Sequence, residues 1–185
     1  MKYTITRQEA YAAKVPHHIF NLNVLLTHLA ISKIILELSH GNSAWFVLVP
    51  LISATIIYYI YRKSVSIGRD GSWFVAANWT LAWRRGRWIL ISYGIASVVI
   101  LVSMLLGSLT GGLMMNDFSD DGGSSSIVEK IGLFFAAVVV FVTILINFLM
   151  TGISVYEAGR GEIDKSIVKF QPRNEQSNPE IIDEK

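Results

Sequence analysis

The chain has 185 residues, a length that suits one domain. Hydrophobic residues make up 52% of it and charged residues only 16%, which is too apolar and too poor in charge for an ordinary soluble domain. There is no cysteine, and this excludes disulfides, thiolate metal sites and cysteine nucleophiles.

The first 14 residues are polar, and we expect a short surface helix from Thr6 to Ala13. No apolar run precedes this segment, so it does not resemble a cleavable signal peptide, and the first hydrophobic segment is expected to stay as an anchor. That segment runs from about residue 15 to 38. Its uncharged part, Val15 to Ser32, would extend about 27 Å as a helix, enough to cross the hydrocarbon of a bilayer.

A second span is predicted over residues 44–61. It has no charge and closes with three tyrosines, which are typical of the membrane–water boundary, and Arg62 and Lys63 then end it. Pro50 lies seven residues into this span, and we expect a kink there.

The stretch from Trp73 to Trp88 is the most distinctive part of the chain. It holds four of the five tryptophans, three arginines and no acidic residue. Trp and Arg settle at the membrane–water boundary, so we expect an amphipathic helix that lies in the interface or continues into the next span. The residues expected to contact lipid headgroups or a partner are Trp73, Trp79, Trp83, Arg84, Arg85, Arg87 and Trp88.

Two alternatives remain open for this stretch. It is either a site for anionic headgroups or a cytoplasmic partner, or an ordinary stop-transfer boundary in which Arg fixes topology and Trp fixes depth. Three arginines pressed against a bilayer make a patch too small for nucleic acid, which we do not expect as a partner.

The third span is predicted over residues 88–115. Ser103, Gly107 and Gly111 recur every four residues in it, a pattern of small side chains that lets another helix approach closely. An acidic loop follows, in which Asp117, Ser119 and Asp121 match the first oxygen donors of a calcium-binding loop. The position that should supply a bidentate Glu is Val128, so we expect no calcium site and no other bound metal.

The fourth span is predicted over residues 131–156, with Thr143, Asn147, Thr151 and Ser154 on one face. Residues 161–185 form a charged tail whose end, from Gln171, is expected to be disordered. Of the 16 Lys and Arg residues, 14 lie in the N-terminus, the 62–87 loop and the tail, all on one side of a four-span chain. This bias predicts cytoplasmic termini.

The polar residues of the first span allow two interpretations. On a helical wheel Asn21, His28 and Ser32 form a column, with Lys33 and Glu37 about a third of a turn round the helix. A column with ionisable members inside a membrane suggests a proton or ion path. The alternative is packing, in which these side chains bind the polar face of span four, including Asn147 and Thr151.

All four histidines lie between positions 17 and 40. A b-type haem in a helical bundle needs two imidazoles, usually from facing helices, and the other three spans have no histidine. Only a homodimer pairing His28 across its axis could supply both ligands, so we expect no cofactor.

The sequence therefore predicts an all-α membrane protein, a bundle of four transmembrane helices over residues 1–160. We expect a non-catalytic accessory, assembly or scaffolding subunit in a bacterial inner membrane, in contact with the lipid bilayer and with another membrane protein or a second copy of itself. A small transporter or channel component using the polar column is the second hypothesis, and a b-type haem protein the third. No Ser/His/Asp set and no phosphate-binding Gly loop indicates an enzyme.

Overall fold

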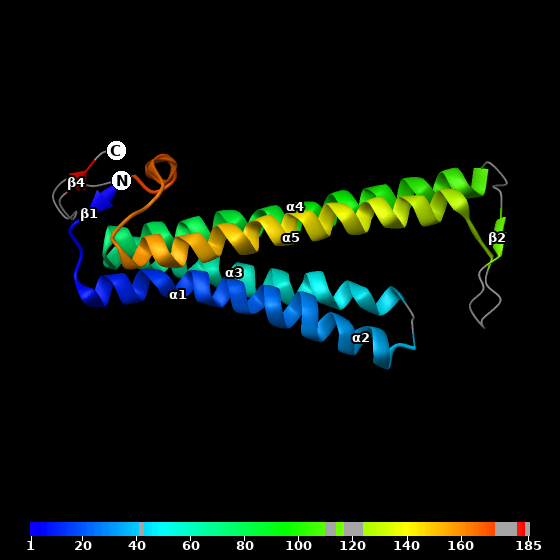
Figure 1. The fold of residues 1–185 in the computed structure, drawn as a ribbon, viewed down its shortest axis with the longest axis horizontal. Helices are drawn as coiled ribbons and strands as arrows, with labels where there is room; N and C mark the ends of the chain where they lie inside the picture. Colours follow the sequence, from blue (N-terminus) through cyan, green and yellow to red (C-terminus); the bar gives the residue numbers. More distant parts are fainter. Residues whose placement is uncertain (41–42, 110–113, 117–123, 173–180, 184–185) are drawn as a thin grey trace. The chain divides into compact units, whose positions relative to one another are not determined.

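The computed structural model describes residues 1–40, 43–109, 114–116, 124–172 and 181–183. Four helices in this part of the chain are long and apolar enough to cross a membrane: Arg7–Leu38, Trp45–Arg69, Trp73–Leu109 and Ile127–Gly159. Figure 1 shows these long helices and the short strands near their ends. The predicted fold class is confirmed, and the chain is an all-α integral membrane protein.

The first span is longer than predicted and is built from three pieces: α1 (Arg7–Asn23), a π-helix η1 (Val24–Ile31) and α2 (Ser32–Leu38). Thr6 caps α1 in a reciprocal pair with Glu9, and this capping box satisfies backbone donors at the helix start. The short surface helix expected over 6–13 is therefore the beginning of the span itself.

The second span begins with a 3-10 turn, η2 (Ser43–Val47), and continues as α3 (Leu48–Asp70). Pro50 is the third residue of α3. A proline in the first helical turn removes no hydrogen bond within the helix, because the N–H groups of that turn have no partner there. Pro50 thus lies in the first turn of α3, where it is compatible with the helix.

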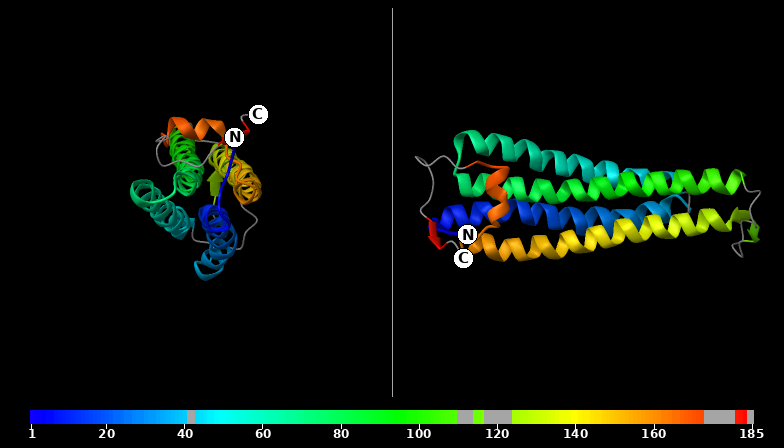
Figure 2. Two further views of the ribbon diagram at one scale, coloured as in Figure 1. Left: turned by 90° about the vertical axis from the view of Figure 1, so that its left-hand side faces the viewer. Right: turned by 90° about the horizontal axis from the view of Figure 1, so that it is seen from above.

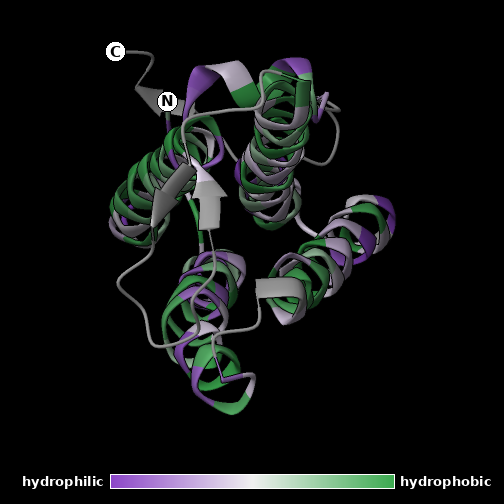
Figure 3. Cartoon of the chain, turned by 90° about the vertical axis from the view of Figure 1, so that its right-hand side faces the viewer, coloured by the Kyte–Doolittle hydropathy of each residue, from purple (hydrophilic) through white to green (hydrophobic). Residues whose placement is uncertain are grey.

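The third and fourth spans lie within the two longest helices, α4 (Trp73–Leu109) and α5 (Ile127–Gly159). The Trp/Arg stretch forms the first turns of α4 without a break, so of the two arrangements considered the chain adopts the continuous one. Two short strands between these helices, β2 (Met114–Asn116) and β3 (Ser124–Ser126), pair antiparallel. In Figure 3 hydrophobic residues predominate along the helices, as burial in lipid requires.

The chain divides into two compact units. Unit 1 comprises residues 1–87 and 146–185, and unit 2 comprises residues 88–145. Unit 1 contains all of α1 and α3, which lie side by side, together with the start of α4 and the end of α5 (Figures 1 and 2).

At one end of unit 1, the two ends of the chain form a structure that we call the cap, made of residues 1–5, 160–171 and 181–183. β1 (Lys2–Tyr3) pairs with β4 (Ile181–Asp183), and the short helix η3 (Lys165–Lys169) follows α5. Tyr3 donates its N–H to Gly161 O at 2.8 Å. Gly161 has φ +75°, and a Cβ there would lie 2.5 Å from Tyr3 O, so glycine suits both the turn and the close approach.

The cap packs on the first turns of α4, and together they form a hydrophobic core. Trp73, Phe74, Ala77 and Leu81 cluster with buried residues of the other segments: Tyr3, Ala13, Ala158, Ile163 and Ile167. The Tyr3 ring lies 5.2 Å from the Trp73 ring and 5.9 Å from the Phe74 ring, centroid to centroid. A helix that is apolar all round is stable only when other elements surround it, and here both ends of the chain do so.

In unit 2, small residues bring α4 and α5 together. A Cβ on Gly132 of α5 would lie 1.8 Å from Ser103 Oγ and 2.3 Å from Ser103 Cβ. A Cβ on Gly107 would lie 2.9 Å from Glu129 Oε1 and 3.1 Å from Ser126 Cβ. Ser103 and Gly107 therefore pack within this helical hairpin, while Gly111 lies outside the described residues.

We expect Gly132→Ala to destabilise the hairpin of α4 and α5, because its methyl group would overlap Ser103. Overpacking of this kind costs about 1–3 kcal/mol. Gly94→Ala is the matched control, since a Cβ there has nothing within 4 Å and both changes gain similar helix propensity. Thermal unfolding in detergent measures the difference, and Ser103→Gly should restore part of the loss. Equal melting of the two single variants would contradict this packing.

Candidate functional site

The Trp/Arg stretch turns one face toward the segment after α5. Trp73 Nε1 donates to Gln171 O at 2.9 Å, and Thr80 Oγ1 donates to Gln171 Oε1 at 3.4 Å. The Arg84 guanidinium carbon lies 3.0 Å from the centroid of the Phe170 ring, a cation–π contact. Residues 73, 80 and 84 share a face at helical spacing, so this face of α4 binds the cap.

A second face of the same stretch packs on α3. The Trp79 ring lies 6.2 Å from Tyr59 and the Trp83 ring 4.9 Å from Tyr61, centroid to centroid. The Arg87 guanidinium carbon lies 5.7 Å from the centroid of the Trp83 ring. Two of the three tyrosines expected to form a lipid-boundary belt, Tyr59 and Tyr61, therefore contact tryptophans of the neighbouring helix.

These contacts correct the expectation that all seven Trp and Arg residues reach lipid or a partner. Trp73 and Trp79 are only 7% and 5% exposed, so neither can form an outer surface. Of the other five Trp and Arg residues, Trp83, Arg84 and Arg85 are half-buried. Arg87 and Trp88 are exposed. The physical reason is that α3 and the two chain ends surround the first turns of α4.

In the first span, buried polar side chains meet Ser53 of α3, a residue that no sequence pattern had singled out. Asn23 Nδ2 donates to Ser53 Oγ at 2.9 Å, and His28 Nε2 lies 3.1 Å from the same oxygen. All three side chains are buried. Ser53 thus joins two turns of the first span to the second span, whereas the packing interpretation of the polar residues had expected span four as their partner.

Nearer the cap, His17 pairs with Asn78 of α4, and this contact fixes the state of the imidazole. Asn78 Nδ2 donates to Phe74 O at 2.9 Å, so Asn78 Oδ1 must be the atom 3.0 Å from His17 Nε2. An amide oxygen only accepts, so Nε2 carries the hydrogen and Nδ1 of the neutral ring is an acceptor. His17 Nδ1 is buried and has no hydrogen-bond partner among the described residues.

The predicted polar column is not continuous. Asn21 is half-buried, His28 is buried, and Ser32 donates to His28 O at 2.7 Å. Lys33 and Glu37 are exposed and lie 3.7 Å apart as a separate pair. The cause is η1, because a π-helix closes i→i+5 bonds and turns by roughly 80° per residue instead of 100°. Residues after Val24 therefore rotate away from the line of Asn21.

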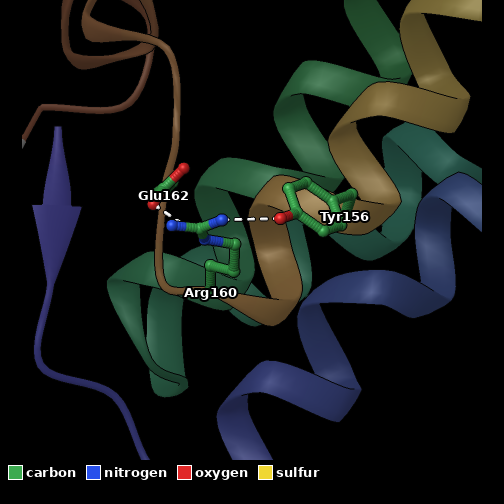
Figure 4. A network of polar contacts seen from close by, with 3 residues as sticks. All are labelled: Tyr156, Arg160 and Glu162. Carbon is green, nitrogen blue, oxygen red and sulfur yellow. Dashed lines mark hydrogen bonds and ion pairs between the residues drawn. The ribbon is translucent and has the colours of Figure 1, made fainter.

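Two threonines of span four donate to the backbone of their own helix. Thr151 Oγ1 donates to Asn147 O at 2.7 Å, and Thr143 Oγ1 donates to Val139 O at 2.8 Å. At the end of α5, Arg160 donates to the Tyr156 hydroxyl and to Glu162 Oε1 (Figure 4). The hydrogen bond to Tyr156 and the charge of Glu162 raise the pKa of Arg160, which stays a cation at every physiological pH.

Within the described residues, no three His, Asp or Glu side chains gather as a metal site would require. The calcium-like pattern begins at positions 117–123, which lie outside the described residues. The chain matches no protein-family model, no curated protein and no solved structure.

Ser53→Ala should lower the free energy of unfolding by about 1–3 kcal/mol, because Asn23 and His28 would both lose a buried partner. Thr55→Ala is the control on the same helix, since the Thr55 hydroxyl is exposed and donates only to Leu51 O of its own turn. Thermal melting of the purified variants in detergent would show the difference. If Ser53→Ala melts like Thr55→Ala, Ser53 does not hold the two helices together.

Proposed function

We propose that the chain is a non-catalytic subunit of a membrane complex, with a role in assembly or scaffolding. The observation that carries this proposal is the cap, a folded element that both ends of the chain build on the first turns of α4. A fixed surface outside the membrane offers other proteins a docking platform. The polar side chains of the first span support the same reading, since Ser53 and Asn78 engage them in packing.

In this proposal the protein lies in a bacterial inner membrane with both termini in the cytoplasm. The bias of 14 among 16 Lys and Arg residues supports that orientation and puts the cap on the cytoplasmic side. The exposed cations of the cap and of Arg87 then face an aqueous compartment rich in potential partners. The binding partner would be another membrane protein or a second copy of this chain.

A second candidate function, a small transporter or channel component, has one observation in its favour. The π-helix η1 lies in the first span and contains His28, and π-helical segments in α-helices often occur at functional sites. Asn23 Oδ1 and His17 Nδ1 are buried acceptors that water could serve. Such water would form the start of a polar path along α1.

The orientation can be tested because the chain has no cysteine. Single cysteines at Ser125, between α4 and α5, and at Ser166, in η3 of the cap, should differ in intact cells. We expect a membrane-impermeant thiol reagent to label the Ser125 site and to reach the Ser166 site only after lysis. Labelling of both sites in intact cells, or of Ser166 alone, would contradict cytoplasmic termini.

Two measurements separate the scaffold from the transporter. We expect the tagged chain, solubilised in mild detergent, to elute as a defined larger assembly, and Gly161→Ala to reduce that assembly by straining the cap. We also expect proteoliposomes of the purified chain to show no pH-driven flux above that of empty liposomes. A chain that elutes alone and conducts protons, with the flux abolished by His28→Ala, would instead support the transporter.

A further inference from the structure

A cavity of about 650 Å³ opens beside the cap, between β1, α4, α5 and the segment that follows α5. Its lining includes two apolar side chains of α5, Met150 and Ile153, and charged groups of both signs. The positive groups belong to Lys2, Arg85, Arg160 and Lys165, and the negative groups to Glu157, Glu162 and Asp164. All of these residues belong to unit 1.

The cavity changes character along α5. Met150, Ile153 and Glu157 follow one face of the helix at spacings of three and four, over about 10 Å of helix length. Met150 and Ile153 are exposed apolar residues of a helix that crosses the membrane, whereas Glu157 lies in its last turn. Tyr156 beside it is exposed and binds Arg160 (Figure 4), as tyrosines at a membrane boundary do. The cavity therefore has an apolar part at Met150 and Ile153 and a charged part at Glu157.

Arg85 provides a cation beside Met150 in this cavity. Its Nη1 donates to Met150 O at 2.8 Å, which uses one of five donors and holds the guanidinium against α5. The carboxylates of Glu157 and Asp164 act on it electrostatically. Glu157 Oε2 accepts from Ser154 at 3.2 Å, so the carboxylate is oriented as well. Arg160 and Glu162 bind each other at 3.1 Å and form the rim.

We propose that this cavity binds a zwitterionic aminophospholipid, a glycerophospholipid whose phosphate carries a primary ammonium group. Arg85 and Lys2 would receive the phosphate, Glu157 and Asp164 would accept from the ammonium, and an acyl chain would lie along Ile153 and Met150. Glu157 and Asp164 would repel a purely anionic headgroup at the place where they would accept from the ammonium group. A choline headgroup has no N–H to donate to Glu157.

The test uses the full chain, delipidated in detergent, with synthetic lipids of identical acyl chains. Native mass spectrometry and thermal shift should both rank phosphatidylethanolamine above phosphatidylcholine and phosphatidylglycerol. Soluble glycerophosphoethanolamine should bind much more weakly, because it lacks the chain that Met150 and Ile153 contact. A ranking led by phosphatidylglycerol, equal stabilisation by all three lipids, or equally strong binding of the soluble headgroup would overturn the proposal.

Variants assign the binding to this cavity. Glu157→Gln should weaken phosphatidylethanolamine by about tenfold, the loss of one charge-assisted hydrogen bond, and remove its preference over phosphatidylcholine. Arg85→Gln should weaken both lipids, although loss of the bond to Met150 O could also disturb folding. If Arg85→Gln does not fold, Glu157→Gln alone tests whether the lipid binds in this cavity. Arg69→Gln and Glu37→Gln, two exposed sites outside the cavity, are the charge-matched controls. If Glu157→Gln binds as the unmodified chain does, the cavity is not the lipid site.

Discussion

The first turns of α4 must be covered on every side, and much of unit 1 follows from that requirement. From Trp73 to Ala82 every residue of the helix is buried, although it is a charge-free stretch leading to three arginines. α3 covers one side through its tyrosines, α1 approaches through His17, and the two chain ends supply the rest. The cap exists because one membrane span alone cannot bury this helix.

Polar groups on the buried stretch show how completely it is enclosed. The indole N–H of Trp73 and the amide of Asn78 each bind a partner, Gln171 O and Phe74 O. Arg84 lies over an aromatic face, and Arg85 binds a backbone carbonyl of α5. A buried polar group without a partner costs free energy comparable to a lost hydrogen bond. The contacts of Trp73 and Arg84 therefore constrain where the segment after α5 can lie.

The long apolar helices of this fold could be predicted from the sequence, whereas the helix ends and the partners of individual side chains could not. Each of the four apolar segments extends over many residues, so the number of long apolar helices could be predicted. The ends of helices depend on single residues. The capping box of Thr6 and Glu9 makes α1 begin earlier in the sequence than the predicted first span. Pro50 lies in the first turn of α3. The partner of His28 was not recoverable, because Ser53 is an unremarkable serine whose role appears only when two helices meet.

The π-helix explains why Asn21, His28 and Ser32 do not follow one line along the first span. A helical wheel assumes a constant turn per residue, and η1 breaks that assumption over eight residues. His28 consequently points toward Ser53, whereas Lys33 and Glu37 emerge at the surface. The composition of Val24–Ile31 does not indicate a π-helix, because the segment is an ordinary apolar run.

The division of the chain into two units falls within the Trp/Arg stretch. The chain divides into its two units between Arg87 and Trp88, and these are the exposed members of the Trp/Arg set. Residues before that point are held by the cap and α3, and residues after it belong to an apolar helix that packs on α5 through Ser103 and Gly107. The Trp and Arg residues of α4 are thus used both in a buried core, as at Trp73, and on the surface, as at Arg87 and Trp88. An aromatic ring with a polar edge is suited both to a membrane–water boundary and to a core that includes hydrogen-bonded groups.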